Sequence, residues 1–134
     1  MNGLRAVLDT NVIVSALLSR TGNPAKVYKM FLNGQLTLVF SDDILAEYQD
    51  VLARPKLQIP QEDLDILLSV IERYGEKVTP SYSTEVMIDE DDRIFLDAAK
   101  SASANLVTGN TRHYHGESFI FTPTEFLEKQ EPQT

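Results

Sequence analysis

Short apolar runs alternate with longer amphipathic stretches along this chain, and this alternation limits the folds that are open to it. LRAVL at residues 4–8 and LTLVF at residues 36–40 are the clearest apolar runs. A short and nearly continuous apolar run is typical of a strand that is buried on both faces of a parallel sheet. Amphipathic stretches between such strands predict helices that cover the two faces. The sequence therefore predicts an α/β fold with a central, mostly parallel sheet.

Capping residues and glycine or proline stops divide the remaining sequence into helices and strands. Helices are expected after Thr10 or Asn11, over residues 24–32 with Asn23 as the N-cap, from Ser41 to about Ala53, over residues 61–74 and from about Asp91 to Ser103. Further strands are expected at residues 77–79, 105–108 and 118–122. Thr122-Pro123-Thr124-Glu125 resembles a capping box and predicts a short last helix.

The chain has 134 residues, which is enough for one domain with a core and too few for two ordinary ones. We expect a single domain over residues 1–130 and a disordered tail over residues 131–134. The absence of cysteine excludes disulfides, thiolate zinc sites and cysteine nucleophiles, and without a signal-peptide pattern it favours the cytoplasm. No apolar run approaches the roughly 20 residues that cross a bilayer, so we expect no membrane association.

The net charge of −8 argues against a protein that holds nucleic acid by bulk electrostatics, because phosphate binding normally needs a basic surface. An acidic protein can still process phosphates when clustered carboxylates bind a metal ion that inverts the local charge. The positions of the acids therefore decide the functional interpretation.

Asp9 directly follows the first expected strand. In open α/β sheets the ligand crevice lies outside the carboxyl ends of the strands, so this position places Asp9 at the crevice. An aspartate before Thr10 and Asn11 is equally typical of a helix N-cap, and for this residue alone the odds are roughly even. Evidence for a site has to come from other acids as well.

Glu47 lies on the helix that is expected after Ser41. The apolar stripe of this helix is formed by Ile44, Leu45, Tyr48, Val51 and Leu52. Helical-wheel geometry places Glu47 at the edge of the stripe, whereas Asp43 and Asp50 lie further toward solvent. Glu47 is the best inward-facing acid, although a solvated boundary residue is favoured by about two to one if this helix is taken alone.

The run Asp89-Glu90-Asp91-Asp92 lies at the start of a helix, where carboxylates are favoured. Asp92 differs from its neighbours because it shares a helical face with apolar residues three, four and seven positions later, whereas Asp97 is expected almost opposite that face. A carboxylate that faces a core needs a partner, since burial without one is costly or neutralises it.

No lysine or arginine obviously serves Asp9, Glu47 and Asp92 together. Like charges gathered at one crevice are best reconciled by a hard divalent cation with oxygen ligands, for which Mg²⁺ or Mn²⁺ is suitable. Such an ion orients phosphate oxygens and lowers the pKa of a bound water, so that no Ser, Cys or His nucleophile is needed. The expected chemistry is metal-assisted hydrolysis of a phosphodiester.

Three segments of the chain are familiar in their order and spacing. LDTNVIVSALL near the start, SDDILAEYQDVLARPKL in the middle and DEDDRIFLDAAKSASANLVTGNTRHY later resemble the PIN-domain family. The resemblance spans nearly the whole chain and is strongest for the branch that contains toxin components of toxin–antitoxin systems. It implies a three-layer α/β/α sandwich and a cytoplasmic ribonuclease with a magnesium or manganese site.

The resemblance also implies roles for individual residues. The first three acids of the family match Asp9, Glu47 and Asp92, as catalytic residues and metal ligands, with Asp91 as the runner-up for the third. The family's small polar positions match Asn11 and Thr108. Its fourth acidic position falls on Asn110, which departs from the four-acid pattern. A neutral amide adds no charge, so we expect one well-held metal ion and a second that arrives with substrate.

The basic residues near these segments are weaker candidates. His113 and His115 could be read as a metal pair, but beside a hard-oxygen site we favour substrate contact or loop exposure by several to one. Arg54, Lys56 and Arg112 are expected in loops that border the crevice, where contact with RNA phosphate and simple solvent exposure are equally plausible. Possible substrate contacts are therefore Arg54, Lys56, Arg112 and His113.

The leading hypothesis implied by the resemblance is a metal-dependent endoribonuclease, the toxin of a toxin–antitoxin pair, which forms a homodimer and is held inactive by a cognate antitoxin. The alternative is a catalytically weak PIN-like module that binds RNA or protein, which Asn110 and the acidic net charge favour. A receiver-type signalling domain is a third possibility, but it requires paired acids after the first strand and a late lysine. Asp9 has no acidic neighbour there, and no lysine follows the last strand at a suitable place.

Overall fold

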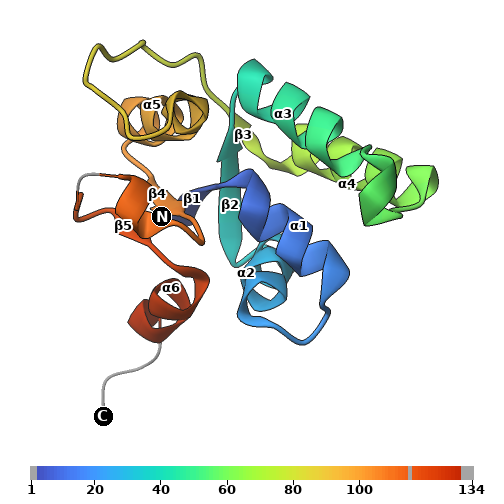
Figure 1. The fold of residues 1–134 in the computed structure, drawn as a ribbon. Coiled ribbons are helices and arrows are strands. Elements are labelled where there is room, and N and C mark those ends of the chain that lie inside the picture. Colours follow the sequence, from blue (N-terminus) through green and yellow to red (C-terminus); the bar gives the residue numbers. More distant parts are fainter. Residues whose placement is uncertain (1–2, 115, 131–134) are drawn as a thin grey trace.

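The strands form a five-stranded, all-parallel sheet in the order β3-β2-β1-β4-β5 (Figure 1). The computed structural model describes residues 3–114 and 116–130. The strands are β1 (Leu4–Leu8), β2 (Leu36–Phe40), β3 (Glu76–Lys77), β4 (Asn105–Val107) and β5 (Ile120–Phe121). All of the expected strands are present, and β3 and β5 are shorter than expected. The prediction of a parallel α/β sheet is therefore confirmed.

Helices cover both faces of the sheet. They are α1 (Thr10–Leu18), α2 (Asn23–Leu32), α3 (Asp42–Leu52), α4 (Gln61–Tyr74), α5 (Arg93–Ala102) and α6 (Pro123–Gln130), with short 3₁₀ helices η1 (Pro55–Leu57), η2 (Glu90–Asp92) and η3 (Thr111–His113). In Figure 1, α5 lies on one face of the sheet, while α1, α2 and α6 lie on the other, with α3 and α4 beside them. The expected three-layer α/β/α sandwich is confirmed. No helix in the described part of the chain is long and apolar enough to cross a membrane.

The continuous apolar run of β1 explains its place in the centre of the sheet. Ala6, Val7 and Leu8 are completely buried, because β1 pairs with β2 on one side and β4 on the other and has helices above and below. Leu38 and Val39 of β2 are buried in the same way. Strands buried on both faces gain from apolar residues at consecutive positions, so the pattern that predicts a parallel sheet also accounts for its stability.

Local capping signals set most helix ends as expected. The Ser41 Oγ accepts a hydrogen bond from the backbone N–H of Ile44 at 3.2 Å. Thr122 and Glu125 form the expected capping box, with distances of 3.1 Å and 2.8 Å for its two reciprocal bonds. One expectation is wrong: Gly22, not Asn23, is the N-cap of α2. The Asn23 side chain instead donates to Thr124 Oγ1, which ties α2 to the start of α6.

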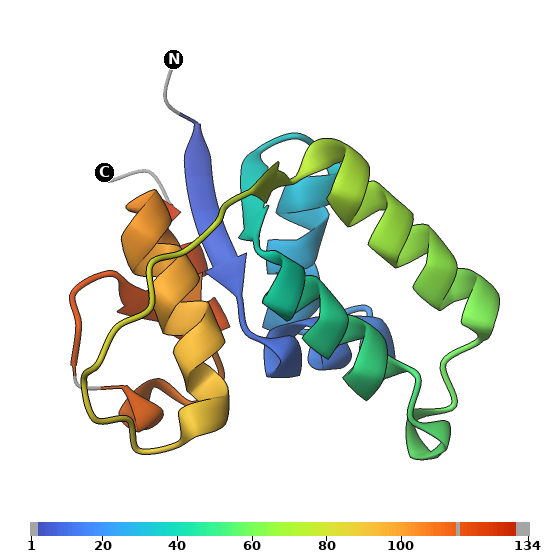
Figure 2. The ribbon, with the colours of Figure 1, turned by 90° about the horizontal axis from the view of Figure 1, so that it is seen from above.

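Asp97 was expected almost opposite the apolar face of its helix, yet this residue is only 2% exposed. Residues 78–89, called the strap below, pass over α5 on their way from β3 to η2 (Figures 1 and 2). The backbone N–H of Ser83 in the strap donates to Asp97 Oδ1 at 3.3 Å, while Asp97 Oδ2 has no hydrogen-bond partner among the described residues. A helical wheel predicts which face of α5 packs on the sheet. It cannot predict that the strap, which has no periodic pattern, covers another face of the same helix.

The start of α5 differs from the expectation by two residues. The α-helix begins at Arg93, and the acidic run forms η2 and its N-cap Asp89. Arg93 joins this region to the strap, because its guanidinium donates to the Ser83 carbonyl at 2.9 Å, the Glu85 carbonyl at 2.6 Å and the Glu90 carboxylate. The expected tail over residues 131–134 lies outside the described residues.

We predict that Gly75→Ala lowers the free energy of unfolding by about 1–3 kcal/mol through overpacking. Gly75 ends α4, and a Cβ there would lie 2.6 Å from the Ile71 carbonyl oxygen and 2.9 Å from the Leu38 carbonyl oxygen. Both are backbone atoms of packed elements and cannot move aside cheaply. Denaturant unfolding measures the change, with Gly3→Ala as the control because a Cβ there meets nothing within 4 Å. Equal stability of the two variants would show that α4 and β2 separate more easily than the structure implies.

Candidate metal centre

The order of strands reverses between β1 and β4, and in open α/β sheets this is the point where the ligand crevice lies, at the carboxyl ends of the strands. Asp9 follows β1, and Thr108 follows β4. The two chain segments are joined there, because the Asp9 N–H donates to the Val107 carbonyl at 2.9 Å and the Gly109 N–H donates to Asn11 Oδ1 at 3.0 Å. The predicted positions of Asp9, Asn11 and Thr108 are thus brought together at one edge of the sheet.

Asp9 is buried, with 6% of its surface exposed. Its Oδ2 accepts hydrogen bonds from Thr108 Oγ1 at 2.8 Å and from the Tyr114 hydroxyl at 3.4 Å, and its Oδ1 accepts one from the Asn11 N–H at 3.4 Å. Asp9 is therefore the N-cap of α1, as one reading of the sequence has it, and it lies directly after the carboxyl end of β1. Burial raises the pKa of the Asp9 carboxyl above its ordinary value, against the effect of these hydrogen bonds.

Glu47 is half-buried on α3, and its neighbour Tyr48 fixes this helix against β1. The Tyr48 hydroxyl, completely buried, donates to the carbonyl of Leu8, the residue before Asp9. Burial raises the pKa of Glu47, and the charges of Asp50, Asp91 and Asp9 raise it further, while Arg54 opposes them. Glu47 thus lies close enough to the crevice for its charge to interact with that of Asp9.

Asp92 lies at the junction of η2 and α5, where its side chain is 13% exposed and makes no capping bond. Its Oδ2 lies 3.0 Å from His113 Nδ1. Burial raises the pKa of Asp92, and the nearby charge of Asp9 raises it too, whereas His113 lowers it. The runner-up Asp91 is exposed, and its charge is among those that raise the pKa of Glu47.

A tighter group lies around Asp92. Potential ligand atoms of Asp89, Asp92 and His113 lie within 4.8 Å of one another. Among the described residues this group does not extend to Asp9 or Glu47. The charge of Asp9 adds to the effect of burial in raising the pKa of both Glu47 and Asp92. The sequence interpretation missed Asp89, which it assigned to ordinary helix capping. The Asp89 Oδ1 does cap η2 by accepting from the Asp91 N–H at 3.0 Å, which leaves its Oδ2 free of that bond.

The donor set suits a hard divalent cation. Carboxylate oxygens from Asp9, Glu47 and Asp92 dominate it. Burial raises the pKa of all three, and the negative charge of Asp9 raises the pKa of Glu47 and Asp92 further. In the part of the chain that the structure describes, no Lys or Arg forms an ion pair with any of the three. A bound cation would supply the missing positive charge. The residues present therefore fit a hard divalent cation.

The remaining predicted residues are mostly exposed. Asn110, Arg112, Arg54 and Lys56 are exposed, and Arg54 pairs with Asp50 at 3.4 Å. The backbone N–H of Asn110 donates to Thr108 Oγ1 at 3.1 Å, so Asn110 helps to orient Thr108 through its main chain. His113 is half-buried beside Asp92, and His115 lies outside the described residues.

We predict that Tyr48→Phe destabilises the protein by about 1–2 kcal/mol, because the buried carbonyl of Leu8 loses its hydrogen-bond donor and has no solvent to replace it. Since that carbonyl precedes Asp9 and Tyr48 follows Glu47, the change should also loosen α3 at the crevice. Thermal unfolding measures the effect, and Tyr74→Phe, at a tyrosine that is 65% exposed, is the control. A Tyr48→Phe protein as stable as the control would show that the Leu8 carbonyl is satisfied in another way.

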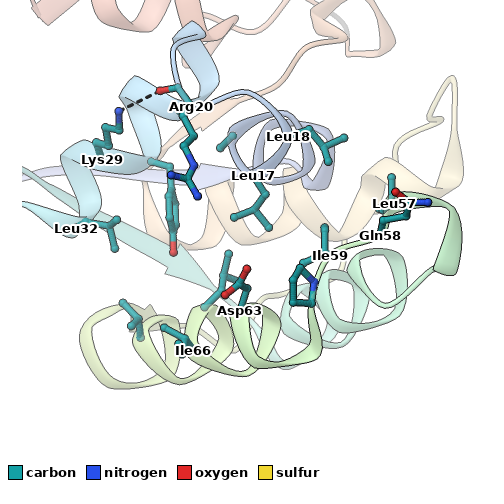
Figure 3. Close-up of a pocket in the computed structure, with 16 residues that line it drawn as sticks. Leu17, Leu18, Arg20, Lys29, Leu32, Leu57, Gln58, Ile59, Asp63 and Ile66 are labelled. Carbon is teal, nitrogen blue, oxygen red and sulfur yellow. Dashed lines mark hydrogen bonds between the residues drawn. The ribbon is translucent and has the colours of Figure 1, made fainter.

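A separate apolar groove of about 470 Å³ lies between α1, α2, α4 and the segment after η1 (Figure 3). Figure 3 shows the side chains of Leu17 and Ile59 directed into it, with Arg20, Lys29 and Asp63 as charged residues of its lining. None of the crevice acids lines this groove. The groove continues onto exposed apolar side chains, since Leu18, Leu32 and Ile66 are each more than half exposed.

Comparisons with known proteins agree on one family. A family model described as PIN domain matches residues 5–112. An uncharacterized protein of Methanocaldococcus jannaschii is 27% identical over 110 residues, which cover 80% of this chain and 71% of that protein. Among solved structures, VapBC2 from Rickettsia felis bound to a DNA fragment from their promoter is similar, with a TM-score of 0.59 and 23% identity over 88% of this chain and 97% of that chain. At this identity the structural likeness concerns the fold.

Proposed function

The chain belongs to the PIN-domain family, and from this premise we propose that it is a metal-dependent endoribonuclease that hydrolyses RNA phosphodiester bonds. PIN domains are generally nucleases. The observation that carries the proposal is the arrangement of Asp9, Glu47 and Asp92, which come from three parts of the fold. Burial raises the pKa of all three, the charge of Asp9 adds to this at Glu47 and Asp92, and none of them forms an ion pair with Lys or Arg in the described residues. Such a set of carboxylates is costly without a cation and useful with one.

The residues of the chain have distinct roles in this proposal. Asp9, Glu47 and Asp92 would hold Mg²⁺ or Mn²⁺ through their carboxylate oxygens. When bound, the ion supplies positive charge for the phosphate oxygens and an activated water nucleophile. Thr108 and Asn11 hold the crevice together, because Thr108 donates to Asp9 and Asn11 accepts from the Gly109 N–H. Arg112 and His113 on η3, with Arg54 and Lys56 across the rim, are the proposed contacts for RNA phosphates.

A toxin–antitoxin setting is part of the same proposal. Its support is the sequence resemblance and the similar fold of VapBC2, whose solved structure contains toxin, antitoxin and promoter DNA. An antitoxin segment that covers the acidic crevice would block cleavage, and the apolar groove of Figure 3 offers surface for the rest of such a partner. We further expect a homodimer in the cytoplasm, and light scattering at micromolar concentration tests the dimer.

The experiment that tests the proposal is cleavage of single-stranded and structured RNA by purified protein with Mn²⁺ or Mg²⁺. Cleavage within single-stranded RNA is expected, and chelation by excess EDTA should stop it, because the described crevice offers acids and no serine, cysteine or lysine nucleophile. Unchanged cleavage in EDTA would falsify the mechanism.

The second candidate function is a catalytically weak PIN-like module that binds RNA or protein. Asn110 favours it, since an amide stands where the family carries a fourth acid. Binding of the same RNA without cleavage, at every metal concentration tested, would select this alternative.

A further inference from the structure

Two consecutive side chains of the segment after β4 contact two different acids of the crevice. His113 Nδ1 lies 3.0 Å from Asp92 Oδ2, and the Tyr114 hydroxyl donates to Asp9 Oδ2 at 3.4 Å. Asp9 and Asp92 are 83 positions apart in the sequence. Asp9 directly follows β1, whereas Asp92 directly precedes α5. One peptide unit thus joins the two carboxylates through their hydrogen bonds.

We infer that His113 and Tyr114 are positioning residues, which hold the carboxylates of Asp92 and Asp9 at the spacing and orientation that a divalent cation needs. The inference rests on the proposed metal site and extends it to two residues outside the acid set. It assigns His113 a role toward Asp92, where the sequence suggested contact with substrate.

The geometry at His113 leaves one oxygen of Asp92 available. An ionised carboxylate can only accept, so His113 Nδ1 must be the donor in this contact. The bond occupies Asp92 Oδ2 and leaves Oδ1 for a cation. Hydrogen bonds of this kind to a metal-binding group orient the ligand, and their loss typically costs about 10- to 100-fold in metal affinity or activity.

Tyr114 also donates to a carboxylate, but it shares its acceptor oxygen with Thr108. Tyr114 is 3% exposed, so its ring is held by packing, and its hydroxyl meets the same Asp9 oxygen that accepts from Thr108 at 2.8 Å. Thr108 remains if the Tyr114 hydroxyl is removed. Asp9 therefore depends less on Tyr114 than Asp92 depends on His113.

The turn that carries both residues is itself well held. The His113 N–H donates to the Asn110 carbonyl and the Tyr114 N–H donates to the Thr111 carbonyl, each at 3.0 Å. Gly109 at its base is bonded to Asn11. The turn can therefore hold the two carboxylates at a fixed distance from each other. Two flexible side chains from separate segments could not do this.

Calorimetric titration of the metal-free protein with Mn²⁺ tests the inference on four variants. His113→Leu keeps bulk but removes the donor and is expected to weaken Mn²⁺ binding by about 10- to 100-fold. His113→Asn places an amide N–H where Nδ1 lies and should recover most of the affinity. Tyr114→Phe should weaken binding less, because Thr108 still donates to Asp9. Tyr74→Phe, on the exposed surface of α4, should not change it.

Thermal unfolding of the same metal-free variants shows whether each one is folded. Equal affinities for His113→Leu and His113→Asn would show that the donor is unimportant, and unchanged or tighter binding in His113→Leu would overturn the inference. Failure of the parent to bind Mn²⁺ would overturn it as well. RNA cleavage is measured separately: a parent that binds Mn²⁺, shows the expected variant order and cleaves no RNA would contradict the proposed function and leave the positioning role standing.

Discussion

Asp92→Asn is expected to abolish metal-dependent RNA cleavage, with a loss of at least about a hundredfold to a thousandfold, since charge stabilisation by a catalytic metal is worth several kcal/mol and each 1.36 kcal/mol is a factor of ten. The substitution keeps the shape of the side chain and an oxygen that can accept from His113 Nδ1. It removes the negative charge that a cation would meet. Single-turnover cleavage of a short single-stranded RNA measures the loss.

Asp91→Asn is the matched control, because Asp91 is the adjacent acid of η2 and is exposed. Asp91→Asn removes one negative charge, as Asp92→Asn does, at the neighbouring position of the chain. We expect it to keep cleavage within a few-fold of the parent. If Asp91→Asn removed activity while Asp92→Asn kept it, the third ligand would be Asp91 and the assignment made from the helical face would be wrong.

The same substitution is expected to change stability in opposite directions with and without metal. Burial and the charge of Asp9 raise the pKa of Asp92 in the folded protein. A carboxyl whose folded pKa lies above its unfolded pKa stabilises the fold most when it is protonated, below the unfolded pKa, and this contribution is lost as the pH rises through the folded pKa. Metal-free Asp92→Asn, which stays neutral, should therefore match the parent at low pH and become relatively more stable toward pH 7.

Addition of Mn²⁺ should reverse this order near pH 7. A cation bound only to the folded state at a hundredfold excess over its Kd stabilises by about 2.7 kcal/mol, or roughly 10 °C in Tm for a chain of this size. The parent should gain this increment, and Asp92→Asn should gain much less. Thermal melts across pH, with and without Mn²⁺, measure both effects. An Asp92→Asn protein that is less stable than the parent without metal would mean that the carboxylate is well partnered in the free protein.

Much of this fold follows from local sequence patterns. The run LRAVL is apolar at positions facing both sides of the strand, and such a strand is stable only between two layers of helices. Ser41 and the Thr122–Glu125 capping box set helix starts through contacts within a few residues. Asp9 could be placed at the crevice for the same reason, because the end of a central parallel strand has a known location.

The features that were missed depend on contacts between distant segments. Asp97 is buried by the strap, which has no apolar periodicity from which its path could be predicted. Tyr114 lies 105 positions from Asp9, and its spacing in the sequence gives no sign that its hydroxyl meets that carboxylate. Asp89 was hidden within a run of acids that has an ordinary explanation at a helix start. For His113 and Tyr114, the sequence offered one indication: they follow a strand whose carboxyl end borders the crevice.

Mn²⁺ binding to the metal-free protein, compared between two variants of α3, tests the central claim most directly. Glu47 is half-buried toward the crevice, whereas Asp43, one turn earlier on the same helix, is exposed. The account predicts one well-held ion in the parent and in Asp43→Asn, and loss of this binding in Glu47→Gln with the fold intact. Equal binding by the parent and Glu47→Gln, or no binding by the parent at millimolar Mn²⁺, would contradict a metal centre built from Asp9, Glu47 and Asp92.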